Sequence, residues 1–203
     1  MKQNTFSRNT SIIDQFIKND IISSDDKELY SYGLHQGMIL LLNIITTILI
    51  GLAFGMAWQS FVFMIAYIPL RSYAGGYHAK TQIGCYFISV LLIITALLGI
   101  RYIPWTITIC LIVVLSAGGI IFFASPVENI NKPLCSTEEK IAYKKKMRII
   151  LFILLGMIFL FWFINRNISI CLAMVLIILS IMIIFGVGRL KFVEIHKSLQ
   201  NIN

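Results

Sequence analysis

Long stretches of this chain carry no charged residue, and this feature constrains its fold more than any other. Charges are absent from residues 37–70, 83–100 and 102–127. Uncharged apolar runs of this length are typical of membrane-spanning helices, because about 20 helical residues cross the hydrocarbon core of a bilayer. The composition agrees with this, since 58% of the residues are hydrophobic and 13% are charged, against about a quarter charged in soluble domains.

Six hydrophobic segments are predicted to form transmembrane helices in an all-α integral membrane protein. They cover residues 37–57, 58–70, 83–100, 103–124, 147–164 and 168–188. The second is expected to end at Pro69. Because the second and fifth are shorter than a full crossing, we expect them to be tilted, re-entrant or matched by local thinning of the bilayer.

The N-terminal 32 residues are polar but carry an apolar stripe at helical spacing, which predicts an amphipathic helix capped by Ser11. This helix lies either on the membrane surface or against the protein's own spans. The segment has no long apolar core of the kind found in removable signal peptides. The length predicts one membrane-embedded domain over residues 1–203, with an N-terminal segment (1–32), a transmembrane core (33–188) and a tail (189–203).

The Lys and Arg residues predict the orientation. With six spans, fifteen of the 17 lie on one side of the membrane and two on the other. The fifteen lie in residues 1–36, 71–82 and 125–146, at Arg148 and from Arg189 onward; the two are Arg101 and Arg166. The positive-inside rule therefore predicts that both termini and the loops 71–82 and 125–146 are cytoplasmic. Topology also accounts for the net charge of +8, so we expect no nucleic-acid partner.

The four cysteines show no CxxC spacing, so the sequence predicts no zinc site, disulfide framework or other metal centre. One of them, Cys85, follows His78 by seven residues. A thiol becomes a strong nucleophile when a nearby imidazole takes its proton. On one continuous helix the two residues would lie about 10 Å apart, so a reactive pair requires that His78 sit in a loop folded back over the helix.

The sequence around this pair permits such a loop. Gly75 and Gly76 allow backbone conformations that are closed to other residues, and Thr81 is a plausible N-cap that places Cys85 in the first helical turn. There the helix dipole favours a thiolate. Spacing alone leaves a second interpretation open, in which Cys85 is a small apolar residue at the end of a span and His78 is solvated.

Two motifs resemble the accessory gene regulator protein B (AgrB) family. The first is residues 71–80 (RSYAGGYHAK) followed by Cys85, and the second is residues 125–129 (SPVEN) with 131–134 (NKPL). The family resemblance implies a multi-pass cysteine endopeptidase in the cell membrane of a Gram-positive bacterium, without a cofactor. It implies His78 as general base and Cys85 as nucleophile, at the cytoplasmic face. It also implies an AgrD-like precursor peptide as substrate, which becomes a cyclic thiolactone autoinducer, and it suggests a homodimer.

Basic residues near this site are candidates for substrate binding. Lys144, Lys145 and Lys146 form a compact positive patch that binds either the acidic part of the precursor or anionic lipid, unless it serves topology alone. Arg71 binds a substrate carboxylate or is simply a positive-inside anchor.

Two other classes of function remain open. The main alternative is a membrane transporter or export component for a small peptide, without proteolytic activity. A non-catalytic scaffold or receptor is the second. Neither explains the loop that carries His78 and Cys85, and the spans hold almost none of the ionisable residues that transporters use.

Overall fold

The computed structural model describes residues 23, 27–77, 81–127 and 137–200. Within this part the chain is helical, as predicted, and the only β-type pairing is an isolated bridge between Gly75 and Val127. The helices are α2 (Lys27–Ala53), α3 (Ala57–Ala74), α4 (Gln82–Tyr102), α5 (Ile107–Ala124), α6 (Thr137–Ile164) and α7 (Arg166–Gln200). The predicted amphipathic helix at Ser11 lies outside the described residues.

The chain divides into two compact units, residues 1–46 and residues 47–203. The first unit is described over the initial part of α2. The second contains the end of α2 and the helices α3 to α7, together with both predicted motifs.

Four helices, α4, α5, α6 and α7, are long and apolar enough to cross a membrane. The apolar part of α2, Gly37–Ala53, is shorter, and α3 is not among the four. Of the six predicted spans, four are therefore confirmed as capable of crossing, and the crossing of the other two stays a prediction. A helix suits this environment because it satisfies its backbone hydrogen bonds internally.

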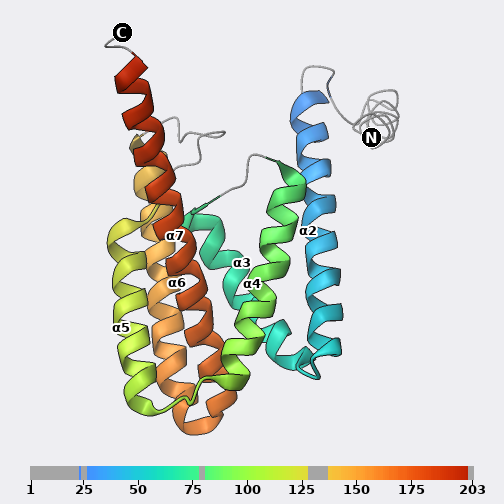
Figure 1. Ribbon diagram of the computed structural model, residues 1–203, viewed down its shortest axis with the longest axis vertical. Coiled ribbons are helices and arrows are strands. Elements are labelled where there is room, and N and C mark those ends of the chain that lie inside the picture. Colours follow the sequence, from blue (N-terminus) through green and yellow to red (C-terminus); the bar gives the residue numbers. More distant parts are fainter. Residues whose placement is uncertain (1–22, 24–26, 78–80, 128–136, 201–203) are drawn as a thin grey trace. The chain divides into compact units, whose positions relative to one another are not determined.

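Helix α7 lies at the centre of the second unit and packs against α3, α4, α5 and α6 (Figure 1). Within its apolar window 72% of the residues are buried, compared with 17–22% in the other three candidate spans. A helix that is apolar on every side is expected in such a central position. Gly99 of α4 faces α7, where a β-carbon would lie 2.6 Å from the end of the flexible Met174 side chain.

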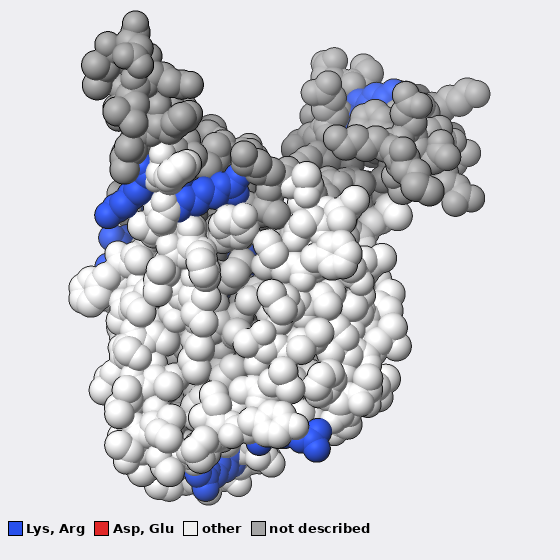
Figure 2. All heavy atoms as spheres, viewed as in Figure 1, with Lys and Arg blue, Asp and Glu red and all other residues white. Residues whose placement is uncertain are grey.

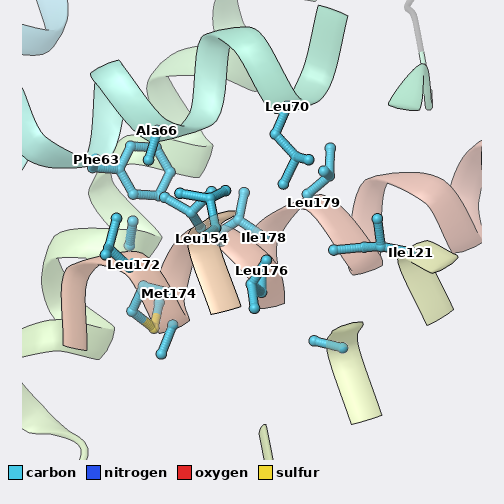
Figure 3. Close-up of a cluster of buried hydrophobic side chains, with 14 of the residues drawn as sticks. Phe63, Ala66, Leu70, Ile121, Leu154, Leu172, Met174, Leu176, Ile178 and Leu179 are labelled. Carbon is cyan, nitrogen blue, oxygen red and sulfur yellow. The ribbon is translucent and has the colours of Figure 1, made fainter. Parts of the chain in front are cut away.

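Helix α3 presents one apolar face to this centre. Its buried residues are Ser60, Phe63, Ala66, Leu70 and Ala74, which recur every three or four positions as on one face of a helix. Figure 3 shows Phe63, Ala66 and Leu70 directed towards the α7 residues between Leu172 and Leu179, with Leu154 of α6 among them. This packing fixes the end of α3, from which the first motif continues.

The structure corrects two predicted boundaries. Helix α3 does not end at Pro69 but continues to Ala74, with Pro69 exposed inside it. Proline removes one backbone donor, and the buried residues on both sides keep the helix continuous. Helix α6 begins at Thr137, so residues 137–146 are helical and not part of a loop, and the fifth hydrophobic segment is the second part of a helix of 28 residues.

The basic residues lie at the two ends of the second unit. One end, called the basic end below, carries Arg71, Lys140, Lys144, Lys145, Lys146, Arg148, Arg189 and Lys191, and the opposite end carries Arg101 and Arg166. Figure 2 shows Lys and Arg at both ends of this unit and none on the broad face between them. The predicted asymmetry is present in three dimensions, while the side that faces the cytoplasm stays a prediction.

Candidate active site

Cys85 lies in the first turn of α4, at the basic end. Thr81 caps the helix as predicted, since its side-chain oxygen accepts the Gly84 N–H at 3.1 Å and its carbonyl accepts the Cys85 N–H at 3.0 Å. The Cys85 thiol is free and partly buried. It therefore combines access from outside with the positive end of a helix dipole, the combination that reactive cysteines use.

The other described cysteines have different surroundings. Cys110 on α5 and Cys171 on α7 are free but buried within the helices. Cys135 lies outside the described residues. Among the cysteines that the structure describes, Cys85 alone is not buried.

Residues 75–77, which precede the helix of Cys85, pack against the central helix α7. Gly75 and Gly76 have φ angles of 74° and 127°, the left-handed conformations expected of glycine here. The Tyr77 N–H donates to the carbonyl of Met182 on α7 at 3.0 Å. Gly186 makes this close approach possible, because a β-carbon there would lie 2.9 Å from the carbonyl carbon of Gly76 and 3.0 Å from the Tyr77 nitrogen.

The two motifs contact each other beside this segment, although about 50 residues separate them in the chain. Val127 forms the isolated bridge with Gly75, and its N–H donates to the carbonyl of Ala74 at 3.0 Å. A β-carbon on Gly75 would collide with the Val127 carbonyl, so the contact requires glycine. The rest of the second motif, from Glu128, lies outside the described residues.

Arg71 holds the same segment from the side of α3. Its Nη1 donates to the Tyr67 hydroxyl at 3.1 Å, and its Nη2 donates to the Tyr77 carbonyl at 2.9 Å. On the other side, the Arg189 guanidinium lies 5.3 Å from the centre of the Tyr77 ring. Arg71 thus has two protein partners in this structure, and its predicted contact with substrate stays a prediction.

His78 follows Tyr77 directly in the sequence but lies outside the described residues, so its distance from Cys85 stays a prediction. The structure does define the position of Tyr77, the residue before His78. The N–H, carbonyl and ring of Tyr77 all have partners, on α7 and α3. Three residues, 78–80, separate Tyr77 from Thr81, the N-cap of α4.

Tyr67 is a site neighbour that the sequence did not single out. It lies on α3, where its hydroxyl accepts the hydrogen bond from Arg71 and its ring stacks on Phe63. The spacing of Tyr67 and Arg71, which are four residues apart on one helix, was the only feature of the sequence that could have indicated their hydrogen bond.

The lysine patch lies on the first turns of α6 rather than in a loop. Lys144, Lys145 and Lys146 are exposed at the basic end. The Lys146 ammonium lies 5.5 Å from the centre of the Tyr73 ring, and Tyr73 in turn contacts Tyr143 edge-on at 5.5 Å. These contacts tie the start of α6 to the last turn of α3, on the same end of the unit as Cys85.

Comparison with known proteins identifies relatives. The family model described as Accessory gene regulator B matches residues 9–184. An AgrB-like protein 2 of Clostridium perfringens strain 13 is 26% identical over 132 residues, and an AgrB-like protein of strain SM101 of that species is 27% identical over 132 residues. Each alignment covers 62% of this chain and 60% of the relative. No solved structure matches the chain.

Proposed function

This chain belongs to the accessory gene regulator B family, and from that premise we propose that it is a membrane cysteine endopeptidase of a quorum-sensing system. Its substrate is an AgrD-like precursor peptide, which it cleaves and helps to cyclise into a thiolactone. Cys85 is the nucleophile and His78 the general base. The observation that carries the proposal is the position of Cys85, a free and only partly buried cysteine in the capped first turn of α4, following the segment that ends at Tyr77 and packs on α7.

The chemistry needs only these groups and the peptide. The Cys85 thiolate attacks a carbonyl carbon of the precursor, and the C–N bond breaks as His78 supplies a proton to the leaving amine. The N-terminal part of the precursor is then held on Cys85 as a thioester. An internal thiol of the precursor displaces Cys85 and closes the ring, and since one thioester replaces another the exchange needs no energy source.

Water competes with ring closure, so the position of the site matters. Cys85 lies where an apolar helix begins, next to exposed apolar residues such as Ile83 and Phe87. A site at the membrane surface limits the access of water to the thioester. Holding the internal thiol near the acyl group also makes ring closure effectively unimolecular.

The lysine patch supplies the means to capture substrate. Lys144 and Lys145 are exposed on the end of the unit that carries Cys85, and they lie on a rigid helix. We place the acidic part of the precursor there. The cytoplasmic location of this end, the cell membrane of a Gram-positive bacterium and a homodimeric assembly belong to the same proposal.

Co-expression tests the function directly. The chain is expressed with candidate precursor peptides, and mass spectrometry searches for a product that is lighter than the precursor by the released tail peptide. This product is one water lighter than the linear fragment that hydrolysis would give. We expect Cys85→Ala to abolish cleavage and cyclisation, and Cys110→Ala and Cys171→Ala to retain both, because those two thiols are buried away from the site. Cleavage at the wild-type rate by Cys85→Ala would favour a transporter or scaffold instead.

A further inference from the structure

Arg148 carries a positive charge that no residue in the described part of the chain balances. It is partly buried on α6, where the apolar part of that helix begins, and its Nε atom is buried without a hydrogen-bond partner. Its guanidinium has no hydrogen bond or ion pair among the described residues and lies over the Phe122 ring of α5, with Cζ 4.2 Å from the ring centre. Because a cation partly removed from water is costly without an anion, we expect an anion from outside the chain.

The neighbouring cations at the basic end differ from Arg148. Arg71 donates two hydrogen bonds within the protein. Lys144 and Lys145 are exposed, so water can solvate their ammonium groups. Of these four residues, Arg148 alone combines partial burial with the lack of a hydrogen-bond acceptor.

A second polar side chain at this place also lacks a partner. Ser125 follows α5 directly and is 4% exposed, and its buried Oγ has no hydrogen bond. Ser125 comes three residues after Phe122, so about one helical turn separates it from the ring under Arg148. In the described part of the chain, Ser125 Oγ and Arg148 Nε are the two buried side-chain polar atoms without a partner. Their common location, where α5 meets α6 at the basic end, favours a polar ligand there.

The surroundings of Arg148 favour a lipid over a soluble anion. Phe152 comes four residues after Arg148, so the two share a face of α6. Phe152 is exposed and contacts the Phe122 ring edge-on, with ring centroids 6.1 Å apart, and Phe123 beside it on α5 is also exposed. A cation that adjoins exposed apolar rings matches a molecule with an anionic headgroup and hydrocarbon chains.

The position of Arg148 along α6 agrees with this match. From Arg148 to the end of the helix at Ile164 is about 24 Å at 1.5 Å per residue. The hydrocarbon core of a bilayer is about 30 Å thick, so Arg148 lies close to the boundary with the lipid headgroups. Long basic side chains at this depth extend towards the lipid phosphates.

We propose that Arg148 binds the phosphate of an anionic phospholipid, with an acyl chain lying against Phe122 and Phe152. The terminal guanidinium nitrogens donate to phosphate oxygens in the bidentate geometry that arginine favours, and the Phe122 ring orients the guanidinium. The start of α6 contacts α3 through Tyr143 and Tyr73, so the bound lipid stabilises the basic end. This inference does not depend on the peptidase function.

The test measures lipid binding by the full-length protein in a neutral detergent. Phosphatidylglycerol is added to the wild type, to Arg148→Gln and to Lys191→Gln, which removes an exposed charge at the same end. Its dissociation constant is obtained from the rise of the thermal unfolding midpoint, and native mass spectrometry counts the retained lipid. We expect saturable binding by the wild type and binding about ten-fold or more weaker in Arg148→Gln, as for the loss of a charge-assisted hydrogen bond. Lys191→Gln should change the constant less than about two-fold, because exposed charges contribute little.

Other probes identify the source of the phosphate. Glycerol phosphate, which lacks the acyl chains, and phosphatidylcholine, which has no net charge, should both raise the midpoint less than phosphatidylglycerol does. Equal stabilisation by glycerol phosphate would assign the site to a soluble phosphate, and equal stabilisation by phosphatidylcholine would remove the need for an anionic lipid. An Arg148-dependent effect of the precursor peptide, with none of the lipid, would assign the site to the substrate. Each of these results would overturn the proposal.

The variants provide the remaining outcomes. Equal weakening in Arg148→Gln and Lys191→Gln would reduce the effect to general attraction between charges and would also overturn the proposal. If Arg148→Gln does not fold in detergent, Phe122→Leu replaces it, since this change keeps the cation and removes the ring that orients it. We then expect lipid binding to weaken by about two-fold or more, and unchanged binding would count against the site.

Discussion

The position of Cys85 could be predicted from the local sequence, whereas the position of His78 could not. Thr81 was predicted to cap α4 and does so, which fixes Cys85 in the first helical turn. The local sequence was sufficient for this because capping depends on neighbouring residues only. The position of His78 depends on a loop conformation that no local rule determines, and His78 lies outside the described residues.

The general-base role of His78 gives a prediction at this scale. His78→Ala should stop formation of the thioester on Cys85 while the protein keeps its thermal unfolding midpoint in detergent, because the change removes the proposed general base and leaves the thiol in place. Acyl-enzyme is measured by acid quench and mass spectrometry. His35→Ala, which alters a histidine in the first unit, serves as the control. Undiminished acylation in His78→Ala would remove His78 from the mechanism.

At the scale of helices, α7 supports the active-site segment, and Gly186 is the position where this support can be tested. An alanine there would press on Gly76 and Tyr77. We expect Gly186→Ala to destabilise the protein by about 1–3 kcal/mol and to reduce cleavage by about 10²-fold, since small displacements of a catalytic group have effects of this size.

The matched control lies on the same helix. Gly188 has no atom near the position of an added β-carbon, so Gly188→Ala should leave activity unchanged and stabilise the helix by up to about 1 kcal/mol. Both variants are compared by thermal unfolding and by cleavage rate. Equal activity of the two variants would show that the contact of Gly76 and Tyr77 with α7 has no part in the reaction.

The start of α6 gives a second prediction at this scale. Changing Lys144, Lys145 and Lys146 together to Gln should weaken precursor binding and flatten its salt dependence, because exposed charges act mainly by long-range attraction that is screened over about 8–10 Å at physiological ionic strength. Changing all three to Glu should weaken binding further. Binding is measured at several salt concentrations.

Arg101→Gln, at the opposite end of α4, is the control for loss of a positive charge away from the lysine patch. Correct membrane insertion is verified for each variant, since the lysines also contribute to orientation. Wild-type processing by the inserted triple Gln variant, at low salt and low precursor concentration, would reduce the patch to a topology signal.

The helices also show what the sequence could not predict. Apolar runs located α4, α5 and the start of α7 to within a few residues, because local composition specifies a membrane span, but α7 continues past the predicted end at residue 188 to Gln200. Pro69 suggested a helix end by a local rule that tertiary packing overrode. The contact of Gly75 with Val127 and that of Tyr77 with Met182 join segments about 50 to 100 residues apart, and no pattern within either segment specifies its partner.

For the whole molecule, the distribution of basic residues predicts which end faces the cytoplasm. Single-cysteine variants are labelled in intact cells with a membrane-impermeant maleimide. A variant that keeps only Cys135 should not react, because the loop 125–136 is predicted to be cytoplasmic, whereas Arg101→Cys in a background without other cysteines should react. Labelling of Cys135 from outside would reverse the topology and place Cys85 on the outer face.

The central claim is that Cys85 forms a covalent thioester with part of a precursor peptide, and intact-protein mass spectrometry measures this directly. Purified protein is mixed with precursor, quenched in acid within one turnover and analysed whole and after digestion. The account predicts a mass increase equal to the N-terminal part of the precursor, located on the peptide that contains Cys85 and removed by neutral hydroxylamine. Processed product formed without any such adduct, and formed equally by Cys85→Ala, would contradict it.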